Sequence, residues 1–210
     1  HGVDALYAPR RTVLDSMLVD AAREAGAEFR YRSGVQSLLR RGDGRVEGVV
    51  VRDHTRGTYQ IRAAIVVGAD GVRSTVAHAV GARDQVRTDA FAAFSYTYWS
   101  GLPVDGYQWF FRSDAFAGAI PTNDGMHCVF VGAPRRHAPD LLTPDPARGY
   151  DVVGRRVGTR FTDLLASGRS VGRFRRFGGL AGHLRTCWGP GWVLVGDAGY
   201  GLVFLILTAV

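Results

Sequence analysis

Two short acidic phrases in this chain combine glycine with a carboxylate where a ligand could bind. Residues 68–71 read Gly-Ala-Asp-Gly, and residues 196–199 read Gly-Asp-Ala-Gly. Glycine lets the backbone approach a bulky ligand and take unusual dihedral angles. A carboxylate beside it can accept hydrogen bonds from sugar hydroxyls, as the acidic residue of dinucleotide folds does. Each phrase alone could be an ordinary strand-to-helix turn with an Asp or Ser cap. Their joint occurrence favours one shared dinucleotide-like ligand.

The elements before and after these phrases would bring the two carboxylates together. The apolar β-branched runs at 63–68 and 192–196 predict strands buried on both faces of a parallel sheet. Ligands of open α/β sheets bind beyond the carboxyl ends of the strands. A helix predicted over 72–80 would direct its free N–H groups and its positive dipole end toward phosphate. We therefore expect Asp70 and Asp197 to converge at one rim.

The first part of the chain has helix and hairpin patterns. Residues 11–26 carry apolar side chains at helical spacing and end in Gly26, a natural helix stop. Short strands are predicted at 28–32, 35–40, 46–52 and 58–62, with a hairpin turn at 41–44.

The middle of the chain predicts an antiparallel sheet rich in aromatic residues. From 90 to 133 apolar and polar residues alternate between turns. Phe94, Tyr96 and Tyr98 share one strand face, as do Tyr107, Trp109 and Phe111. Further strands are predicted at 115–121, 126–131, 171–177 and 183–187, with a loop at 134–146 and a helix at 150–166. Tyr96, Tyr98, Trp109 and Phe111 are the candidate substrate pocket; the alternative is that they form plain sheet core.

The fold class predicted from these elements is α/β: a partial parallel-sheet domain with an inserted antiparallel β-sheet. We expect residues 1–84 to form the first part of a nucleotide-binding domain. Residues 85–182 would form the inserted substrate-binding sheet, and residues 183–210 would return to the first domain.

Three stretches resemble signatures of the p-hydroxybenzoate hydroxylase-like flavoprotein monooxygenases. They are residues 11–18, beginning Arg-Thr-Val-Leu-Asp; residues 68–74, Gly-Ala-Asp-Gly-Val-Arg-Ser; and residues 196–198, Gly-Asp-Ala. They occur in the family's order, and the resemblance covers nearly the whole chain. It implies an FAD-binding domain whose inserted sheet roofs the flavin ring, with NADH or NADPH as the electron donor.

The resemblance also implies individual residue roles. Arg11 would open the helix beside the flavin and reach toward FAD. Asp70 and Gly71 would lie near the pyrophosphate and the path of the nicotinamide donor. Asp197 would bind the ribitol chain. Three further residues complete the implied cofactor site: Gly196 and Ala198 in the same phrase, and Val35 near the adenosine half. Arg73 would contact a phosphate or the nicotinamide, or be a solvated helix residue.

The chain also departs from the family pattern at both ends. No GxGxxG turn precedes Arg11, so we expect the strand, turn and helix that hold the ADP moiety to be missing. After the second phrase, Leu205 and Ile206 stand where relatives have Asp and Pro, and residues 201–210 are atypically apolar. We expect the chain to be a fragment, truncated at both ends.

Several activities remain open within this resemblance. The favoured one is hydroxylation of an aromatic or polyketide-like small molecule with FAD, NAD(P)H and O2, which needs a dry pocket. Reduction of isoprenoid double bonds, as in geranylgeranyl reductases, is an alternative, and so is a non-catalytic fragment. Residues 116–121 keep only the Ile-Pro of the WxWxIP strand of halogenases, which argues against halogenation. No catalytic acid or base is predicted.

Composition argues against other classes of function. All 26 basic residues are Arg and are spread along a chain of net charge +7, so we predict no nucleic-acid binding. The six His and two Cys show no metal-ligand spacing, so we predict no metal site. Ser170 in a GxSxG match lacks the strand-turn-helix context of a hydrolase. No signal peptide or membrane span is predicted, because the apolar run at 202–210 is too short; we expect a cytoplasmic protein.

Overall fold

The computed structural model describes residues 5–88 and 92–201, so the predictions about Leu205, Ile206 and the tail lie outside the described residues. The described residues divide into two compact units. One unit contains residues 5–27 and 92–180, and the other contains residues 28–88 and 181–201. Residues 5–27 therefore group with the inserted sheet, whereas the sequence pattern placed them with residues 28–84. The functional domain boundaries stay a prediction.

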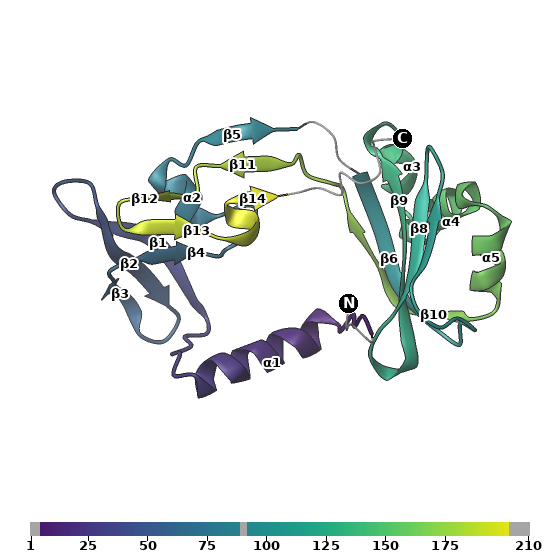
Figure 1. Ribbon diagram of the computed structural model, residues 1–210, viewed down its shortest axis with the longest axis horizontal. Helices are drawn as coiled ribbons and strands as arrows, with labels where there is room; N and C mark the ends of the chain where they lie inside the picture. Colours follow the sequence, from purple (N-terminus) through teal and green to yellow (C-terminus); the bar gives the residue numbers. More distant parts are fainter. Residues whose placement is uncertain (1–4, 89–91, 202–210) are drawn as a thin grey trace. The chain divides into compact units, whose positions relative to one another are not determined.

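The first unit is built on a five-stranded sheet in the order β10-β6-β9-β8-β7 (Figure 1). Every neighbouring pair in this sheet is antiparallel, which confirms the predicted antiparallel insert. The strands are β6 (Ala92–Ser100), β7 (Gln108–Phe111), β8 (Phe116–Pro121), β9 (Met126–Pro134) and β10 (Arg169–Phe177).

Helices cover one face of this sheet (Figure 1). They are α3 (Ala138–Leu141), α4 (Pro146–Val157) and α5 (Thr159–Ala166), with short 3₁₀ turns η1 (Asn123–Gly125) and η2 (Arg135–His137). Asp145 caps α4 by accepting from the backbone N–H groups of Ala147 and Arg148. The predicted single helix at 150–166 is wrong, because Gly158 with φ of 118° separates α4 from α5. The predicted loop at 134–146 is also wrong in part, since it contains η2 and α3.

The core of this unit lies between the sheet and the helices. Leu141 and Phe161 from the helices are fully buried against Val129 and Val131 of β9. These side chains define which face of the sheet is structural core.

The helix α1 (Arg11–Glu24) confirms the predicted helix near the start of the chain. It ends where predicted, since Gly26 adopts a φ of 93°, which favours glycine. No residue of α1 is buried.

The second unit begins with a three-stranded antiparallel sheet. Its strands are β1 (Ser33–Arg40), β2 (Val46–Asp53) and β3 (Gly57–Arg62), as predicted within a few residues. The hairpin at 41–44 is confirmed: the N–H of Gly44 donates to the carbonyl of Arg41 at 2.9 Å. The strand predicted at 28–32 is wrong, because these residues form no strand and Arg32 turns the backbone with φ of 56°.

A parallel pair lies at the centre of the second unit. Here β4 (Val66–Gly68) pairs in parallel with β13 (Trp192–Leu194), which also pairs with β12 (Trp188–Gly189). Among the described strands this is the one parallel pairing. The prediction of strands over 63–68 and 192–196 buried on both faces is wrong in extent and burial: both are three residues long, and Val67 is exposed.

Short elements complete the second unit around the parallel pair. They are α2 (Thr75–Val80), η3 (Gly196–Ala198) and a three-stranded sheet β14-β11-β5, made of β14 (Tyr200–Gly201), β11 (His183–Arg185) and β5 (Asp84–Arg87). The core here is a small cluster that includes Val46, Val76, Leu194 and Ala198. This core supports both acidic phrases, since α2 comes after the first and η3 contains the second.

Candidate functional site

The two acidic phrases leave the parallel pair at the same end. Gly68 is in register with Leu194, and the N–H of Val195 donates to the carbonyl of Gly68 at 2.9 Å. Asp70 and Asp197 therefore come directly after the carboxyl ends of two adjacent parallel strands. This is the edge at which ligands of α/β sheets bind.

Asp197 offers an accessible carboxylate at this edge. Its side chain is exposed, and in the described part of the chain no side-chain or backbone donor reaches its carboxylate. Gly196 before it has a φ of 55°, and a Cβ placed there would meet nothing within 4 Å. The carboxylate of Asp197 and the space beside Gly196 are therefore both unobstructed.

Asp70, in contrast, is engaged by its own chain. Its carboxylate accepts hydrogen bonds from the hydroxyl of Ser74 and from the N–H groups of Thr75 at 2.7 Å and Val76 at 3.3 Å. Partial burial raises the pKa of Asp70, but the bonds from Ser74 and the backbone outweigh it and leave the pKa below its usual value. The Ser74 hydroxyl accepts in turn from Ala77 N–H at 2.9 Å. Asp70 and Ser74 thus cap α2.

Gly71 turns the backbone after Asp70 without any close neighbour. Its φ is 79°, and a Cβ there would meet nothing within 4 Å. The space beside Gly71 is therefore unobstructed, while the exposed Asp70 next to it keeps its hydrogen bonds to α2.

Two side chains of β11, which no motif in the sequence singled out, hold these turns. Arg185 donates to the carbonyls of Ala198 at 3.0 Å and Val72 at 3.2 Å. The Nε2 atom of His183 lies 3.1 Å from the carbonyl oxygen of Asp197. The only sequence signal was their i, i+2 spacing, which places both on one face of a strand. Arg73, exposed, lines a cavity of about 460 Å³ together with Arg185.

Arg11 was predicted to reach the cofactor, but it is the neighbouring Arg10 that tertiary contacts hold in place. The Arg11 side chain is 83% exposed and donates to Asp15 one helical turn on, which raises the pKa of its guanidinium. The Arg10 side chain is 24% exposed and pairs with Asp124. Its guanidinium carbon lies 5.9 Å from the centre of the Tyr98 ring. Arg10 is thus fixed beside a predicted substrate residue.

Val35 lies on β1, opposite Val51 of β2. It is half exposed and lines a shallow surface pocket together with Arg52 and His54.

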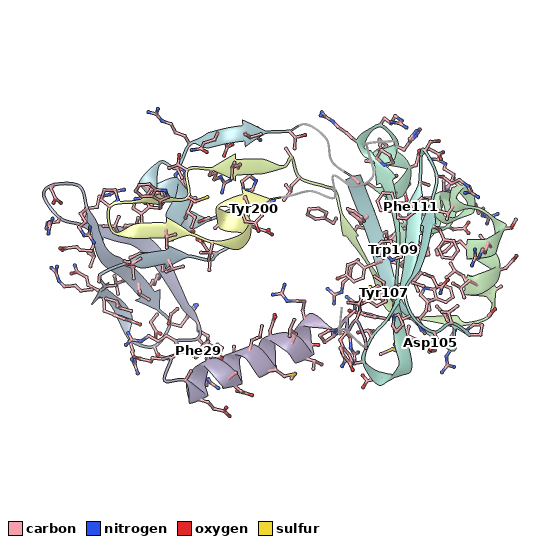
Figure 2. All side chains as sticks on the ribbon, viewed as in Figure 1. Phe29, Asp105, Tyr107, Trp109, Phe111 and Tyr200 are labelled. Atoms are coloured by element: carbon pink, nitrogen blue, oxygen red, sulfur yellow. The ribbon has the colours of Figure 1, made fainter. Side chains whose placement is uncertain are left out.

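Aromatic rings line the sheet face opposite the helices, and we call the seven rings that β6, β7, β8 and β9 place there the aromatic face. Phe177 of β10, in register with Phe94, lies on the same side of the sheet but is not counted in it. Phe110 packs toward the helices, with its ring 5.3 Å from that of Phe161, so its neighbours Trp109 and Phe111 project the other way. Trp109 is 42% and Phe111 48% exposed; both are labelled in Figure 2. The aromatic face consists of Phe94, Tyr96, Tyr98, Trp109, Phe111, Phe116 and Phe130. The predicted substrate residues thus share one face that the helices do not cover.

Five rings of the aromatic face contact one another in one group, and the two tyrosines form a separate pair. The Trp109 and Phe111 rings stack at 6.0 Å, and Trp109 meets Phe130 edge to face at 5.5 Å. Phe116 meets Phe94 at 5.2 Å. Tyr96 and Tyr98 form a further pair at 6.3 Å. Such pairs each contribute about 0.5–1.5 kcal/mol beyond their burial.

Two glycines let the rings of the aromatic face lie across the strands. A Cβ on Gly132 would fall 2.1 Å from the ring of Phe116, and one on Gly118 would fall 2.6 Å from Phe130. The packing of these rings therefore depends on missing side chains as well as on the rings themselves.

Basic and thiol groups border the Tyr98 end of the aromatic face. Arg175 of β10 is in register with Tyr96, and Cys128 of β9 with Tyr98. Burial raises the pKa of the Cys128 thiol to about 11. Burial also raises the pKa of Tyr98, although Arg10 and Arg175 act in the opposite direction.

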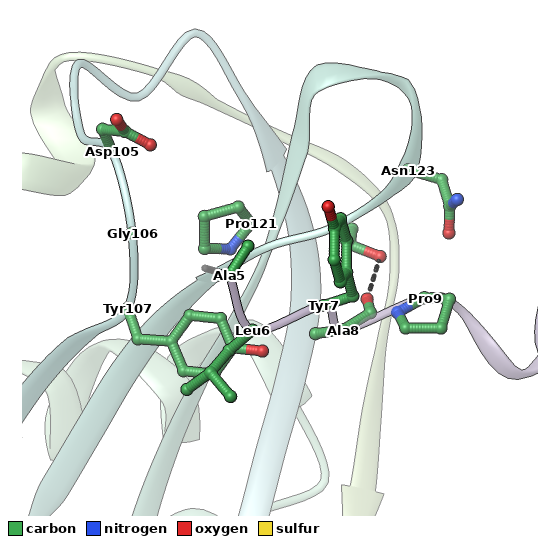
Figure 3. Close-up of a pocket in the computed structure, with 11 residues that line it drawn as sticks. Ala5, Leu6, Tyr7, Ala8, Pro9, Asp105, Gly106, Tyr107, Pro121 and Asn123 are labelled. Carbon is green, nitrogen blue, oxygen red and sulfur yellow. Dashed lines mark hydrogen bonds between the residues drawn. The ribbon is translucent and has the colours of Figure 1, made fainter. Parts of the chain in front are cut away.

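A separate cavity of about 820 Å³ lies at the end of this sheet (Figure 3). It is lined by the segment 5–9, by Tyr107 and by the turn at 121–123. The hydroxyl of Thr122 donates to the carbonyl of Ala8 at 2.8 Å and holds the segment in place. Tyr96, Tyr98, Trp109 and Phe111 do not line this cavity.

The described ranges 5–88 and 92–201 contain neither a cluster of metal ligands nor a membrane-spanning helix. No group of three His, Cys, Asp or Glu side chains there could hold a metal ion. No helix there is both long and apolar enough to cross a bilayer.

Comparisons with known proteins identify the family of this chain. The family described as "FAD binding domain" matches residues 5–145. The digeranylgeranylglycerophospholipid reductase 2 of Methanopyrus kandleri is 26% identical over 200 residues, covering 91% of this chain and 48% of the reductase. The chain spans about half the length, or less, of the curated relatives it matches.

Solved structures share the fold at low sequence identity. A triple mutant of a flavin-dependent brominase superposes with a TM-score of 0.82 at 17% identity, covering 93% of this chain and 50% of the brominase. Aklavinone-11 hydroxylase, in complex with FAD and aklavinone, superposes with a TM-score of 0.68 at 20% identity, covering 91% and 36%. Because the family match includes α1, the first acidic phrase and the aromatic strands, the chain belongs to the FAD binding domain family.

Proposed function

We propose that the full-length protein is an FAD-dependent monooxygenase that uses NAD(P)H and O2 to hydroxylate an aromatic or polyketide-like substrate. The observation that carries the proposal is the aromatic face. A group of five contacting rings and a separate pair of tyrosine rings line a sheet face that the helices leave uncovered, in a family that binds FAD. A planar aromatic molecule is the ligand that such a face would bind best, because rings stack on rings.

The residues at the two acidic phrases fit FAD. Asp197 has a carboxylate without an internal donor, beside a glycine whose open side meets nothing within 4 Å. We infer that it accepts hydrogen bonds from the ribitol hydroxyls, with Gly196 and Ala198 shaping the turn. Asp70 supports the site indirectly, since it fixes the start of α2, and the space beside Gly71 is unobstructed. Val35, Arg11 and Arg73 stay predicted contacts of the adenosine half, the flavin and a phosphate or nicotinamide.

FAD supplies the redox chemistry when it is bound, and the protein's own groups bind, orient and exclude water. The aromatic face would bind the substrate ring and keep water from it. Arg10 and Arg175 place positive charge near Tyr98, which would favour a substrate with an acidic oxygen at that end. No residue of the described chain is assigned as a general acid or base.

A second candidate is flavin-dependent reduction of isoprenoid double bonds. The observation that favours it is the reductase of Methanopyrus kandleri, which aligns over 91% of this chain. A reductase would need a long apolar channel, whereas the aromatic face is a set of rings on an open sheet surface, bordered by Arg10, Arg175 and Cys128. For this reason hydroxylation is the preferred proposal.

The proposal is tested with the full-length protein. We expect a yellow flavin spectrum after purification, NAD(P)H consumption stimulated by aromatic polyketides, and a product heavier by one oxygen atom. Isoprenoid substrates that gain two hydrogens instead would favour the reductase. A protein that neither binds FAD nor consumes NAD(P)H would contradict both candidates and leave the non-catalytic alternative.

The Trp109→Ala variant tests whether the aromatic face binds the substrate. Loss of the Trp109 ring removes two ring contacts, so we expect the KM for an aromatic substrate to rise about 3- to 30-fold while FAD affinity is unchanged. Trp188→Ala is the matched control, because Trp188 is the most exposed Trp of the described residues and lies outside the aromatic face. Equal KM values for the two variants would remove the aromatic face from the proposal.

A further inference from the structure

We propose that Arg185 is a positioning residue that holds the turns at Asp70 and Asp197 in one arrangement, and that this arrangement sets the affinity for FAD. The second half of this inference rests on the proposed function, whereas the first half concerns the protein without cofactor. The residue lies on β11, outside the three signature stretches.

The guanidinium of Arg185 joins both turns through backbone oxygens. Its Nη1 donates to the carbonyl of Ala198, one residue beyond Asp197, at 3.0 Å. Its Nη2 donates to the carbonyl of Val72, two residues beyond Asp70, at 3.2 Å. One rigid planar group thus spans the two phrases where they diverge from the paired strands.

The guanidinium of Arg185 has a third hydrogen-bond partner. Its Nε donates to the carboxylate of Asp84 at 3.1 Å, and the Arg185 side chain is only 18% exposed. Because the guanidinium is planar and rigid, it loses little conformational freedom for each of the three hydrogen bonds that it forms. Lysine has a single ammonium on a flexible stem and cannot reproduce this planar arrangement.

A neighbouring side chain supports the same turn. His183, two residues before Arg185 on the same strand face, is buried, and its Nε2 lies 3.1 Å from the carbonyl oxygen of Asp197. A Cβ on Gly201 would fall 2.9 Å from the His183 ring, so the ring is closely enclosed. The backbone of β11 adds a bond from the N–H of Arg185 to the carbonyl of Gly199 at 2.8 Å. The Asp197 turn is therefore anchored to β11, and Arg185 extends that anchor to the Asp70 turn.

The experiment compares Arg185→Lys with the wild type of the full-length protein. Without FAD, hydrogen exchange is measured by mass spectrometry for peptides covering 70–77 and 196–199. With FAD, the dissociation constant is measured by flavin fluorescence. Because Arg185→Lys removes two hydrogen bonds to the turns, we expect exchange in both peptides to be about tenfold faster and FAD to bind about tenfold more weakly.

Arg87→Ala is the matched control. Arg87 pairs with the same Asp84 at 3.3 Å but makes no hydrogen bond to either turn. We expect this variant to exchange and to bind FAD as the wild type does. Asp84→Asn should have an intermediate effect, since Arg185 keeps its two carbonyl bonds.

The possible outcomes separate this inference from the proposed function. The inference would be overturned if Arg185→Lys exchanged hydrogen at both turns as slowly as the wild type. It would also be overturned if exchange became faster to the same degree throughout residues 28–88 and 181–201, because that would indicate a purely structural role. Faster hydrogen exchange at both turns with an unchanged dissociation constant for FAD would overturn the claim that this arrangement sets the affinity for FAD. If the wild type binds no FAD, the proposed function fails, while the exchange measurement still decides whether Arg185 couples the turns.

Discussion

At the scale of single residues, two aspartates in nearly identical phrases have different roles. Ser74 and α2 come shortly after Asp70, so its carboxylate caps a helix. Asp197 lies in the short turn η3, and its carboxylate stays exposed. The difference arises from the residues after each phrase, and it is the basis on which we propose direct ligand binding for Asp197 and support of the site for Asp70.

Asp197→Asn should weaken FAD binding without unfolding the protein. The carboxylate has no internal donor to lose, but it would lose charge-assisted hydrogen bonds to FAD hydroxyls. A charge-assisted bond contributes about 1.5–3 kcal/mol, so we expect the dissociation constant to rise about 10- to 100-fold, measured by flavin fluorescence. The control is Asp163→Asn on the exposed side of α5. Equal affinities of the two variants would exclude Asp197 from the cofactor site.

Asp70→Ala should lower stability in a pH-dependent way. It removes acceptors from Ser74, Thr75 and Val76, and loss of a helix cap costs about 1 kcal/mol. Because the pKa of Asp70 is lowered on folding, its contribution is fully present above the unfolded pKa of about 4 and is lost as pH falls through the lower folded pKa.

The measurement for Asp70 is urea unfolding of wild type and variant between about pH 3 and 7. We expect the difference in the free energy of unfolding to be constant near neutral pH and to shrink in acid. A difference that grows as pH falls would contradict the capping role.

At the scale of elements, strand alternation decides the two faces of the five-stranded sheet. In β7, Phe110 faces the helices and Trp109 and Phe111 face away. The same alternation in β9 sends Val129 and Val131 into the core and Phe130 to the aromatic face. One sheet thus combines a structural core with the aromatic face, for which we propose substrate binding.

Gly132→Ala should distort the aromatic face. The new methyl group would fall 2.1 Å from the Phe116 ring, which must move and disturb its contact with Phe94. Overpacking of this kind costs about 1–3 kcal/mol, so we expect a lower melting temperature and weaker binding of aromatic substrates. The control is Gly178→Ala, where the nearest side-chain atom is 3.7 Å away. If both variants melt like the wild type, the close packing of Phe116 on Gly132 is not required.

At the scale of the whole molecule, the described chain has two separate cores. One lies between the five-stranded sheet and its helices and includes Phe161. The other lies around β4, β13 and α2 and includes Val46 and Leu194. The aromatic face belongs to the first unit and the two acidic phrases to the second.

Phe161→Ala should destabilise the first unit selectively. Phe161 is fully buried, and truncation of a buried Phe costs about 3–5 kcal/mol. We expect hydrogen exchange to accelerate across residues 92–180 while residues 28–88 keep wild-type rates. Equal acceleration in both units would show that the two cores unfold together.

The sequence by itself determined the local elements and the chemistry available to them. Apolar spacing and glycine stops predicted α1 and the β1–β2 hairpin, and alternation predicted which rings share a strand face. The acidic phrases and their family resemblance predicted the FAD binding domain family. Each of these signals is contained within a short stretch, since it depends on backbone preferences and on side-chain periodicity.

The tertiary structure alone decided which side chains meet and which groups stay free to bind a ligand. It showed that Asp70 is used by α2 and that Arg10, not its neighbour Arg11, is fixed beside Tyr98. It also showed that the helices cover only one face of the sheet, and that Arg185 lies between two turns far apart in sequence. No local pattern contains such contacts, because a strand's partner and a guanidinium's acceptors are chosen by the packing of distant segments.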